Sequence, residues 1–420
     1  MEKNTIINKL NHNKERMLTT LKWIVFSFLV GIVLGLIGAF FYHGIRLATQ
    51  YRLSHSWVLF MLPFGAVLIR FLYHLANYDN DGGTNLVLSA IQSDDNIPKR
   101  MSGLIFISTI FSHFVGASVG REGAALQLGG SIGNSVGKLF RFNDTEKKTM
   151  IMVGMSAVFS ALFGTPLAAA IFSMEVVSVG IMHYAALVPC VIASLVARGV
   201  ATYLGAPNAS YEIESIPQFN LMTGAQTAFL AMLCGLVSIL FCVALHQSDA
   251  WSKKLFKNPY LRAFVGGTLI FVLTMLEGNQ TYNGAGVEYI KDCMAGETDT
   301  FAFLFKIIFT AICIAAGYKG GEIVPSFFIG ASFGCLFGNI LGLSPSLCAA
   351  IGMGAVFCGV TNSPITAFII CLELFGMEGA PYFLLAVALS YMLSGYYGLY
   401  SSQKIIYSKY KSNYINARTK

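Results

Sequence analysis

The chain of 420 residues is 55% hydrophobic and only 12% charged, and its mean hydropathy is +0.63. Soluble domains carry about 25% charged residues, so this composition excludes a soluble enzyme, a disordered protein and a nucleic-acid-binding protein. The formal net charge of +7 lies mostly at the two ends of the chain. Basic residues that flank apolar spans orient a protein in a membrane. We therefore expect a multi-pass membrane protein surrounded by a lipid bilayer.

The first apolar run covers residues 21–42 and follows a segment, 1–20, that contains several Lys and Arg residues. Its length matches the roughly 20 residues that cross the hydrocarbon core of a bilayer. We predict a first transmembrane helix here, and no cleavable signal peptide is evident. The tail 404–420 carries basic residues and no acidic ones. Both ends of the chain are therefore expected in the cytoplasm.

Apolar segments then follow one another almost to the end of the chain, and several of them are too short to span a bilayer. Gly or Pro interrupts them at 120–133, 164–171, 317–338 and 362–373. In lipid, irregular backbone survives only where protein buries it or where it lines a cavity. Short, broken helices that meet in the middle of the membrane are typical of transporters built from inverted repeats.

An internal repeat is visible in the sequence. The segment GMSAVFS at 154–160 returns as GMGAVFC at 352–358, and a Pro and a Glu follow both copies at the same offset of 198 residues. A weaker match joins LGGSIG at 128–133 to IGASFG at 329–334, at an offset of 201. Two matches in order at nearly one offset indicate a duplication rather than chance.

The repeat predicts the fold class, an all-α polytopic membrane protein that forms an inverted-repeat bundle of many tilted and partly broken helices. The expected organisation is a cytoplasmic segment at 1–20, a first repeat at 21–210, a linker at 211–220, a second repeat at 221–403 and a basic cytoplasmic tail at 404–420.

The motif G-R-E-G at 120–123 sets a charged pair between two apolar segments. An ionisable residue at membrane depth costs about 2.5–3.5 kcal/mol on insertion scales, and it is a functional candidate for that reason. The glycines allow tight turns and the close approach of a ligand. Glu122 is therefore a candidate for reversible protonation. A structural Arg–Glu pair, or a loop at the membrane interface, is the alternative.

The motif G-G-E-I-V-P at 320–325 matches this position in the second repeat, where Ile323 corresponds to Glu122 and Glu322 to Arg121. Gly before a helix and Pro just inside it favour a helix start, and the free N–H groups of such a start favour an anion. A glutamate at this place is expected to be protonated or paired, with Lys319 as a possible partner. A surface ion pair is the alternative.

Weaker signals accompany these two motifs. The segment D-G-G-T-N-L at 81–86 is a polar, Gly-rich entry into an apolar run, and it reads as a turn when taken alone. Thr165 and Ser363 each precede a Pro, which predicts a helix start with a capping side chain. Glu175 and Glu373 end their apolar segments and are expected to be interfacial or hydrogen-bonded.

Other polar groups inside the apolar runs have simpler interpretations. His113 is expected to be a core histidine with its hydrogen bonds satisfied. The nine cysteines form no C-x-x-C pair and lie mostly inside apolar runs. We interpret them as small buried hydrophobic residues rather than as disulfides or a zinc site. No metal and no cofactor is expected.

Taken in order, G-G-T-N-L at 82–86, G-R-E-G at 120–123, G-G-E-I-V-P at 320–325 and a late Tyr resemble the CLC family of anion channels and anion/proton antiporters. The resemblance covers nearly the whole chain. Within the family the chain is most similar to the bacterial fluoride/proton antiporter branch. The first motif lacks the serine and proline of the family's chloride site, and Glu322 replaces an isoleucine. Val176 stands where chloride/proton exchangers carry an internal proton glutamate.

The resemblance implies that Glu122 is the protonatable gate and Tyr400 the inner tyrosine, with Tyr396 and Tyr397 as close competitors. The anion-binding residues that it implies are Gly83, Thr84, Asn85, Gly123, Glu322, Ile323, Val324 and Tyr400, with Arg121 and Tyr396 in support. It also implies fluoride and protons as substrates, a homodimer with one pore per subunit, and a place in the cell (inner) membrane. Ala124 departs from the proline that usually follows G-R-E-G, and Val324 from a threonine common in the fluoride branch.

Export of fluoride in exchange for protons, which gives fluoride resistance, is therefore the predicted function. A chloride or other halide/proton antiporter, or a passive anion channel, is the alternative within the family. An intramembrane serine protease that uses His113 and Ser118 leaves the inverted repeat unexplained. A receptor or structural membrane protein leaves Glu122 and Glu322 without a reason.

Overall fold

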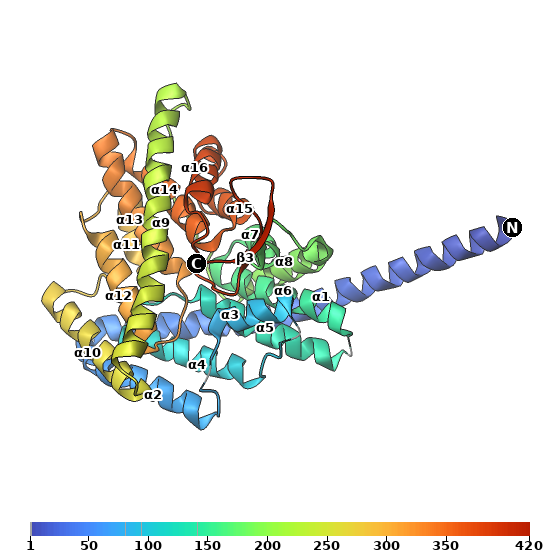
Figure 1. The fold of residues 1–420 in the computed structure, drawn as a ribbon, viewed down its shortest axis with the longest axis horizontal. Coiled ribbons are helices and arrows are strands. Elements are labelled where there is room, and N and C mark those ends of the chain that lie inside the picture. Colours follow the sequence, from blue (N-terminus) through green and yellow to red (C-terminus); the bar gives the residue numbers. More distant parts are fainter. Residues whose placement is uncertain (1, 80, 94, 141) are drawn as a thin grey trace.

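The computed structural model describes residues 2–79, 81–93, 95–140 and 142–420, which form sixteen α-helices and one small sheet (Figure 1). In the first part of the chain the helices are α1 (Glu2–Ser54), η1 (Ser56–Met61), α2 (Leu62–Leu75), α3 (Gly83–Gln92), α4 (Arg100–Val115), α5 (Glu122–Leu139), α6 (Asp144–Phe163), α7 (Pro166–Glu175), η2 (Tyr184–Ala186) and α8 (Leu187–Tyr203). In the second part they are α9 (Leu221–Leu255), α10 (Pro259–Glu277), α11 (Val287–Met294), α12 (Ala302–Ala316), α13 (Ile323–Leu341), α14 (Pro345–Thr361), α15 (Pro364–Phe375) and α16 (Ala380–Leu393).

The predicted bundle of long and broken apolar helices is confirmed. Among the described residues, six helical spans are long and apolar enough to cross a membrane, and α4, α7, α12, α14, α15 and α16 are shorter apolar helices. The long spans are α1, α2 with η1, α8 with η2, α9, α10 and α13. Long and short apolar helices in one bundle are what an inverted-repeat transporter requires.

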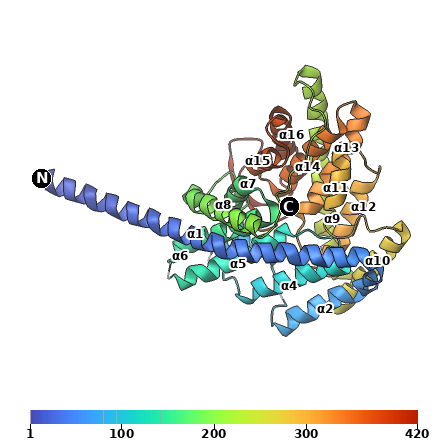
Figure 2. The same cartoon turned by 180° about the vertical axis from the view of Figure 1, so that it is seen from behind.

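The first helix is much longer than expected. The prediction placed it at 21–42, but α1 is one continuous helix of 53 residues. No proline interrupts the chain before Pro63, so nothing stops the helix at the ends of the apolar run. Its first turns project from the bundle, and its later part crosses the bundle beside α8 and α6 (Figure 2).

Left-handed residues end four of the helices at the predicted breaks. Gly116, Gly164 and Gly317 end α4, α6 and α12 with φ of 96°, 78° and 100°, and Asn362 ends α14 with φ of 56°. Gly adopts this conformation without a steric penalty, and Asn tolerates it better than most residues. The broken helices expected from Gly and Pro are therefore present.

The repeated glycines bring two helices together in each half of the chain. A Cβ on Gly154 in α6 would collide with the carbonyl oxygen of Gly129 in α5, and one on Gly352 in α14 would collide with that of Gly330 in α13. These glycines come from the matching segments of the sequence. Close backbone contact between small residues is a common means of packing helices in membranes.

A short bridge joins the two halves at their matching motifs. The N–H of Gly120 donates to the carbonyl of Gly321 at 2.6 Å, and the N–H of Gly321 donates back to Gly120 at 2.8 Å. These residues are 201 positions apart, which is the offset of the second sequence match. The reciprocal contact supports our proposal of two related halves, 21–210 and 221–403.

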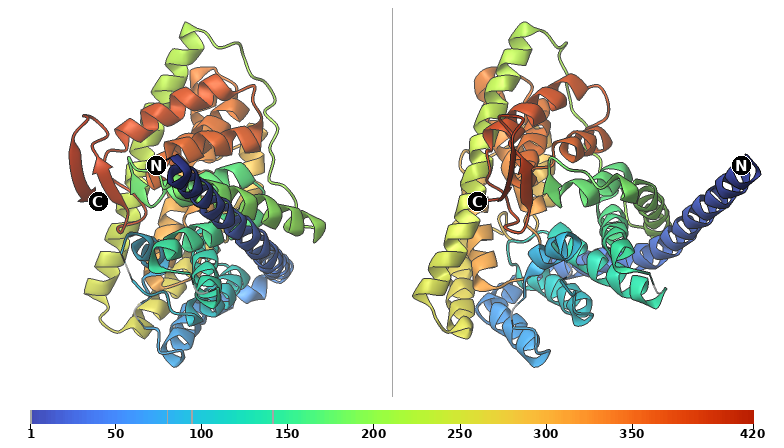
Figure 3. Two further views of the ribbon diagram at one scale, coloured as in Figure 1. Left: turned by 90° about the vertical axis from the view of Figure 1, so that its right-hand side faces the viewer. Right: turned by 45° about the vertical axis from the view of Figure 1, so that its right-hand side comes forward.

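The segment that joins the two halves is extended and runs along the edge of the bundle (Figure 3). It begins directly after α8 ends at Tyr203, earlier than the expected 211–220, and it leads to α9. The N–H of Tyr211 donates to the carbonyl of Leu374 at 2.9 Å, and the hydroxyl of Tyr382 donates to that of Pro217 at 2.9 Å. The linker is therefore fixed against the second half.

The basic tail folds into a small sheet, for which the sequence gave no signal that we used. Strand β2 (Lys404–Tyr407) pairs in parallel with β1 (Ser178–Val179) and antiparallel with β3 (Tyr414–Arg418) (Figure 3). The hydroxyl of Thr419 donates to the carbonyl of Tyr400 at 2.6 Å. The tail thus covers the segment that carries the predicted inner tyrosine.

Candidate functional site

Helices α3, α5 and α13 begin next to one another inside the bundle. A Cβ on Gly123 in α5 would lie 2.9 Å from the Cα of Gly321, 3.3 Å from Oε2 of Glu322 and 3.5 Å from Oγ1 of Thr84 in α3. The first turn of α5 therefore touches both the entry to α13 and the first turn of α3. Helix starts carry partial positive charge and free N–H groups, so their convergence favours an anion.

Glu122 opens α5 and its side chain is 0% exposed. Its Oε1 lies 3.2 Å from Nε of Arg121, and its Oε2 accepts the backbone N–H of Arg121 at 3.0 Å. A Cβ on Gly120 would lie 2.9 Å from the same Oε2, so a larger residue at 120 would displace the carboxylate. The expected burial of Glu122 is found, and a loop at the membrane interface is contradicted. A buried carboxylate needs a partner or a proton.

Glu322 is the last residue before α13, and it remains partly exposed where Glu122 is sealed. Its carboxylate points toward Gly123, as the 3.3 Å approach to that residue shows. Ile323 and Val324 follow in the first turn of α13, both buried, and no described side chain caps this helix start. The N–H groups of this turn therefore face the same region as the Glu322 carboxylate.

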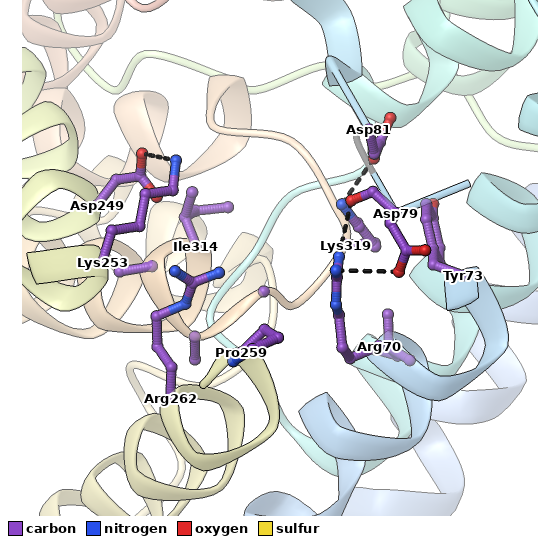
Figure 4. Close-up of a pocket in the computed structure, with 14 residues that line it drawn as sticks. Arg70, Tyr73, Asp79, Asp81, Asp249, Lys253, Pro259, Arg262, Ile314 and Lys319 are labelled. Carbon is purple, nitrogen blue, oxygen red and sulfur yellow. Dashed lines mark hydrogen bonds and ion pairs between the residues drawn. The ribbon is translucent and has the colours of Figure 1, made fainter. Parts of the chain in front are cut away.

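The expected pairing of Lys319 with Glu322 is wrong. Nζ of Lys319 lies instead 2.6 Å from Oδ2 of Asp81, in the loop before α3 (Figure 4). Lys319 and Glu322 are an odd number of residues apart in a bridged, extended segment, so their side chains leave on opposite sides. In the same view Arg70 reaches Asp79 at 3.0 Å.

Asp81 also occupies the start of α3. Its Oδ1 accepts the backbone N–H of Gly83 at 2.9 Å, so the anion-binding role expected for that N–H is filled here by a carboxylate of the protein. The polar entry at 81–86 is therefore more than a simple turn. Sequence reasoning missed Asp81 because an Asp two residues before a helix is common at any turn.

Thr84 and Gln127 form a second contact between α3 and α5. The Thr84 hydroxyl donates to the carbonyl of Gly123 at 3.3 Å and accepts from Nε2 of Gln127 at 3.2 Å. Oε1 of Gln127 is buried and has no hydrogen-bond partner among the described residues. Sequence analysis overlooked Gln127, although a lone amide inside an apolar helix is a signal that could have found it.

Asn85 and Tyr400 lie on the tail side of the site. Oδ1 of Asn85 accepts the N–H and the hydroxyl of Ser402, both at 3.0 Å, so this oxygen positions the segment after Tyr400. Tyr400 is 2% exposed, and its hydroxyl has no partner among the described residues. Glu322 and Glu122 both act electrostatically on that hydroxyl. Tyr400 is thus placed beside the two carboxylates.

Tyr396 lies elsewhere. Its hydroxyl lies 2.8 Å from Oγ of Ser408, and its ring centroid lies 5.8 Å from that of Tyr410. These partners belong to the tail, so the structure connects Tyr396 with the tail rather than with the carboxylates. Between these two candidates for the inner position, the geometry favours Tyr400.

The protease arrangement is absent. Ser118 stands in G-A-S-V-G at 116–120, a pattern that also occurs around catalytic serines. Its hydroxyl, however, lies 3.2 Å from that of Thr310, and no hydrogen bond to His113 occurs in the described part of the chain. His113 is buried, but Nε2 has no partner there, so the expectation of a fully satisfied histidine is wrong.

Glu175 and Glu373 each cap a helix of the opposite half, which confirms the hydrogen-bonded role. Glu175 accepts the N–H groups of Ile365 and Thr366 at 3.0 and 2.8 Å, and Glu373 accepts those of Leu167 and Ala168, both at 2.9 Å. Each carboxylate thereby meets the positive end of a helix that starts at a proline. The two halves are joined here by a reciprocal exchange.

The capping side chains expected at Thr165 and Ser363 do not cap their helices. Neither makes a side-chain hydrogen bond to its own helix start, and Ser363 donates backward to the carbonyl of Thr361 at 3.2 Å. The two glutamates already occupy the N–H groups that these side chains would have accepted. Sequence alone could not show this, because the glutamates come from the other half.

The described residues hold no group of three or more His, Cys, Asp or Glu close enough to bind a metal ion. All nine cysteines are buried, as the interpretation of small hydrophobic residues requires. The ionisable groups that the site brings together are therefore Glu122, Glu322, Arg121 and the Asp81–Lys319 pair. This arrangement, carboxylates between half-helix starts inside an apolar bundle, defines a membrane ion-transport protein.

Comparison with known proteins agrees with this class. A family model described as "voltage gated chloride channel" matches residues 64–395. A "chloride/fluoride channel protein" of Pseudomonas syringae pv. tomato is 36% identical over 396 residues, which cover 93% of this chain and 88% of that protein. The "H(+)/Cl(-) exchange transporter ClcA" of Vibrio cholerae is 26% identical over 89% of this chain and 85% of its own length.

A solved structure gives the same result. The crystal structure of a CLC-type fluoride/proton antiporter superimposes with a TM-score of 0.88 at 28% identity and covers 91% of this chain and 98% of its own. The chain belongs to the CLC family of voltage gated chloride channels and related transporters. It is a CLC-family anion/proton transporter of the membrane.

Proposed function

We propose that this protein exports fluoride in exchange for protons and thereby gives resistance to fluoride. The observation that carries the proposal is the Glu322 carboxylate, which stands at the start of α13 and points to Gly123 beside the buried Glu122. A permanent negative charge at a helix start repels a chloride ion from that place. A carboxyl that gains a proton becomes a hydrogen-bond donor, and fluoride is the halide that accepts hydrogen bonds most strongly.

Glu122 would act as the gate. Ionised, it holds the position beside the start of α5 that an anion would take, and Arg121 stabilises it there at 3.2 Å. Protonated, it loses this attraction and leaves the position free. Alternating occupation by the carboxylate and by the anion couples one movement to the other, since both compete for the same positive end of the helix.

Fluoride is strongly hydrated, so its path must replace many hydrogen bonds with water. The N–H groups at the start of α13, Ile323 and Val324, and the region around Gly123 would supply donors. The unpartnered hydroxyl of Tyr400 would supply another from the tail side. Gly83, Thr84 and Asn85 would contribute indirectly, because their polar groups are engaged with the protein.

Two features of the relatives support the assignment. One relative carries both chloride and fluoride in its name, and one solved neighbour is described as a fluoride/proton antiporter. We further propose a place in the cell (inner) membrane, with both termini in the cytoplasm, and a homodimer in which each subunit has its own pathway.

The test is transport by the purified protein in vesicles. Vesicles loaded with fluoride, and matched vesicles loaded with chloride, are diluted into anion-free buffer, while an electrode and a pH dye record anion release and proton uptake. Fluoride release with simultaneous proton uptake, much faster than chloride release, supports the proposal. Equal or faster chloride exchange identifies a chloride/proton antiporter instead, and release without proton uptake identifies a passive channel.

A further inference from the structure

A large cavity lies at the end of α1 that is farthest from the N-terminus. Its volume is about 830 Å³, and its walls come from the last turns of α1, the linker at 207–211 and the loop and helix at 280–292. Arg121 also lines it, so the cavity reaches the residue that holds the Glu122 carboxylate. The proposed transport mechanism assigns no role to the other polar groups in this wall.

Arg52 is the notable group among them. It lines the cavity near the end of α1, is only 3% exposed, and makes no ion pair or side-chain hydrogen bond with any described residue. A buried guanidinium without a counter-charge is expensive, because the lost hydration is not replaced. His113 in the same wall also has an unpartnered buried nitrogen.

The carbonyl groups around Arg52 are already occupied. The carbonyl of Gly116 accepts from Nδ2 of Asn283 at 2.8 Å, and those of Tyr282 and Gly284 accept from Nζ of Lys306 at 3.0 and 2.8 Å. Arg52 lies against this backbone, since a Cβ on Gly284 would be 3.2 Å from Nη2. The wall is therefore rich in donors and has its nearby acceptors in use.

The charge around Arg52 is positive as well. Arg52 and Lys306 are both buried, and each lies close enough to act electrostatically on His113. The nearest acid of the transport pathway, Glu122, is held by Arg121, and Glu288 in the cavity wall is held by Lys291 at 2.9 Å. Uncompensated positive charge at the wall of a cavity raises the local concentration of anions.

We infer that this cavity contains a second anion site, separate from the half-helix starts, in which the Arg52 guanidinium holds a small monovalent anion of the halide type. Lys306 adds charge behind the wall, and His113 lies beside the bound ion. Arg52 contacts an anion after it has passed Arg121, or before it reaches that residue. The site goes beyond the proposed function, because it requires only that the ion be a small anion and not that it be fluoride.

Bromide is a suitable probe, because its anomalous scattering locates it in crystals of the full-length protein and distinguishes it from water. A bromide peak within hydrogen-bond distance of the Arg52 guanidinium is expected. Arg52→Met should remove this peak, while Arg46→Gln, which changes an exposed arginine in the wall of the same cavity, should leave it. A wild-type map without bromide at Arg52, or an unchanged peak in Arg52→Met, overturns the inference.

A solution measurement covers the case in which Arg52→Met does not fold. Arg52→Lys retains the charge but lacks the planar set of donors, so binding of chloride, followed by the line width of the chloride NMR signal, should weaken roughly tenfold. Unchanged binding in Arg52→Lys together with an empty wild-type map contradicts the site. Because neither measurement uses transport, a failure here is distinct from a failure of fluoride export.

Discussion

Nζ of Lys319 lies 2.6 Å from Oδ2 of Asp81, and this ion pair joins the entry of α13 to the entry of α3. The same Asp81 accepts the first N–H of α3 at 2.9 Å. The pair is therefore not only a contact between two loops. It connects the proposed halves of the chain at the place where both approach the carboxylate pair, and it fixes how far apart two of the three helix starts lie.

The first prediction concerns this pair. Lys319→Met leaves the Asp81 carboxylate, which is 6% exposed, without its cation and should destabilise the protein by about 2–3 kcal/mol. The measurement is the midpoint of thermal inactivation in detergent. The double variant Asp81→Asn with Lys319→Met should recover part of the loss, because no buried charge then remains unpaired. Strict additivity of the two single losses would contradict the direct coupling.

A second prediction tests the gate. Glu122→Gln keeps the size of the side chain but cannot ionise, so the alternation between carboxylate and anion is lost. Fluoride release from loaded vesicles should then no longer drive proton uptake. Glu378→Gln, an exposed glutamate in the turn before α16, is the matched control and should transport as the wild type does. Unimpaired coupled transport by Glu122→Gln would remove Glu122 from the mechanism.

The third prediction concerns selectivity. Glu322→Ala removes the carboxyl that points toward Gly123, and with it one hydrogen bond that a protonated acid would donate to fluoride. The rate of fluoride release should fall about tenfold or more, since hydrogen bonds to a charged partner are strong. Chloride release, measured in parallel, should fall less or rise. An equal fall for both ions would mean that Glu322 shapes the pathway without distinguishing the halides.

The sequence predicted the broken helices well, because each break has a local cause. Gly116, Gly164, Gly317 and Asn362 adopt left-handed backbone, and these residue types are visible in the sequence. The alignment of Ile323 with Glu122 also predicted that both would be first residues of matching helices, as α13 and α5 show. Repetition within one chain carries this information without any structure.

The partners of the charged groups could not be predicted in the same way. Lys319 pairs with Asp81 from a position 238 residues away, and Glu373 caps a helix that begins 207 residues before it. Such choices depend on how the two halves meet, which no local pattern records. The strand pairing of the tail is a further example, since Lys404 meets Ser178 only after the bundle has formed.

The fourth prediction follows from the exchange of helix caps. Glu175→Ala should cost more stability than Glu373→Ala, because Glu175 accepts a third hydrogen bond, from the Thr366 hydroxyl at 2.6 Å, and is more deeply buried. Losing a charged cap costs about 1–2 kcal/mol, and the additional bond about 1 kcal/mol more. Thr366→Val should lose only that last part. Thermal inactivation of the three variants gives the order, and a larger loss for Glu373→Ala would contradict it.

The fifth prediction concerns the glycine contacts that repeat in both halves. Gly352→Ala places a methyl group against the carbonyl of Gly330, where backbone from two helices leaves no room, and the helices must separate. Overpacking of this kind costs about 1–3 kcal/mol, so the inactivation temperature should fall. The control is Gly103→Ala, at a helical position in α4 where a Cβ would meet nothing within 4 Å. There the higher helix propensity of Ala should raise stability by about 0.5–1 kcal/mol. If both variants moved in the same direction, helix propensity rather than close packing would explain the conserved length of the contact between α13 and α14.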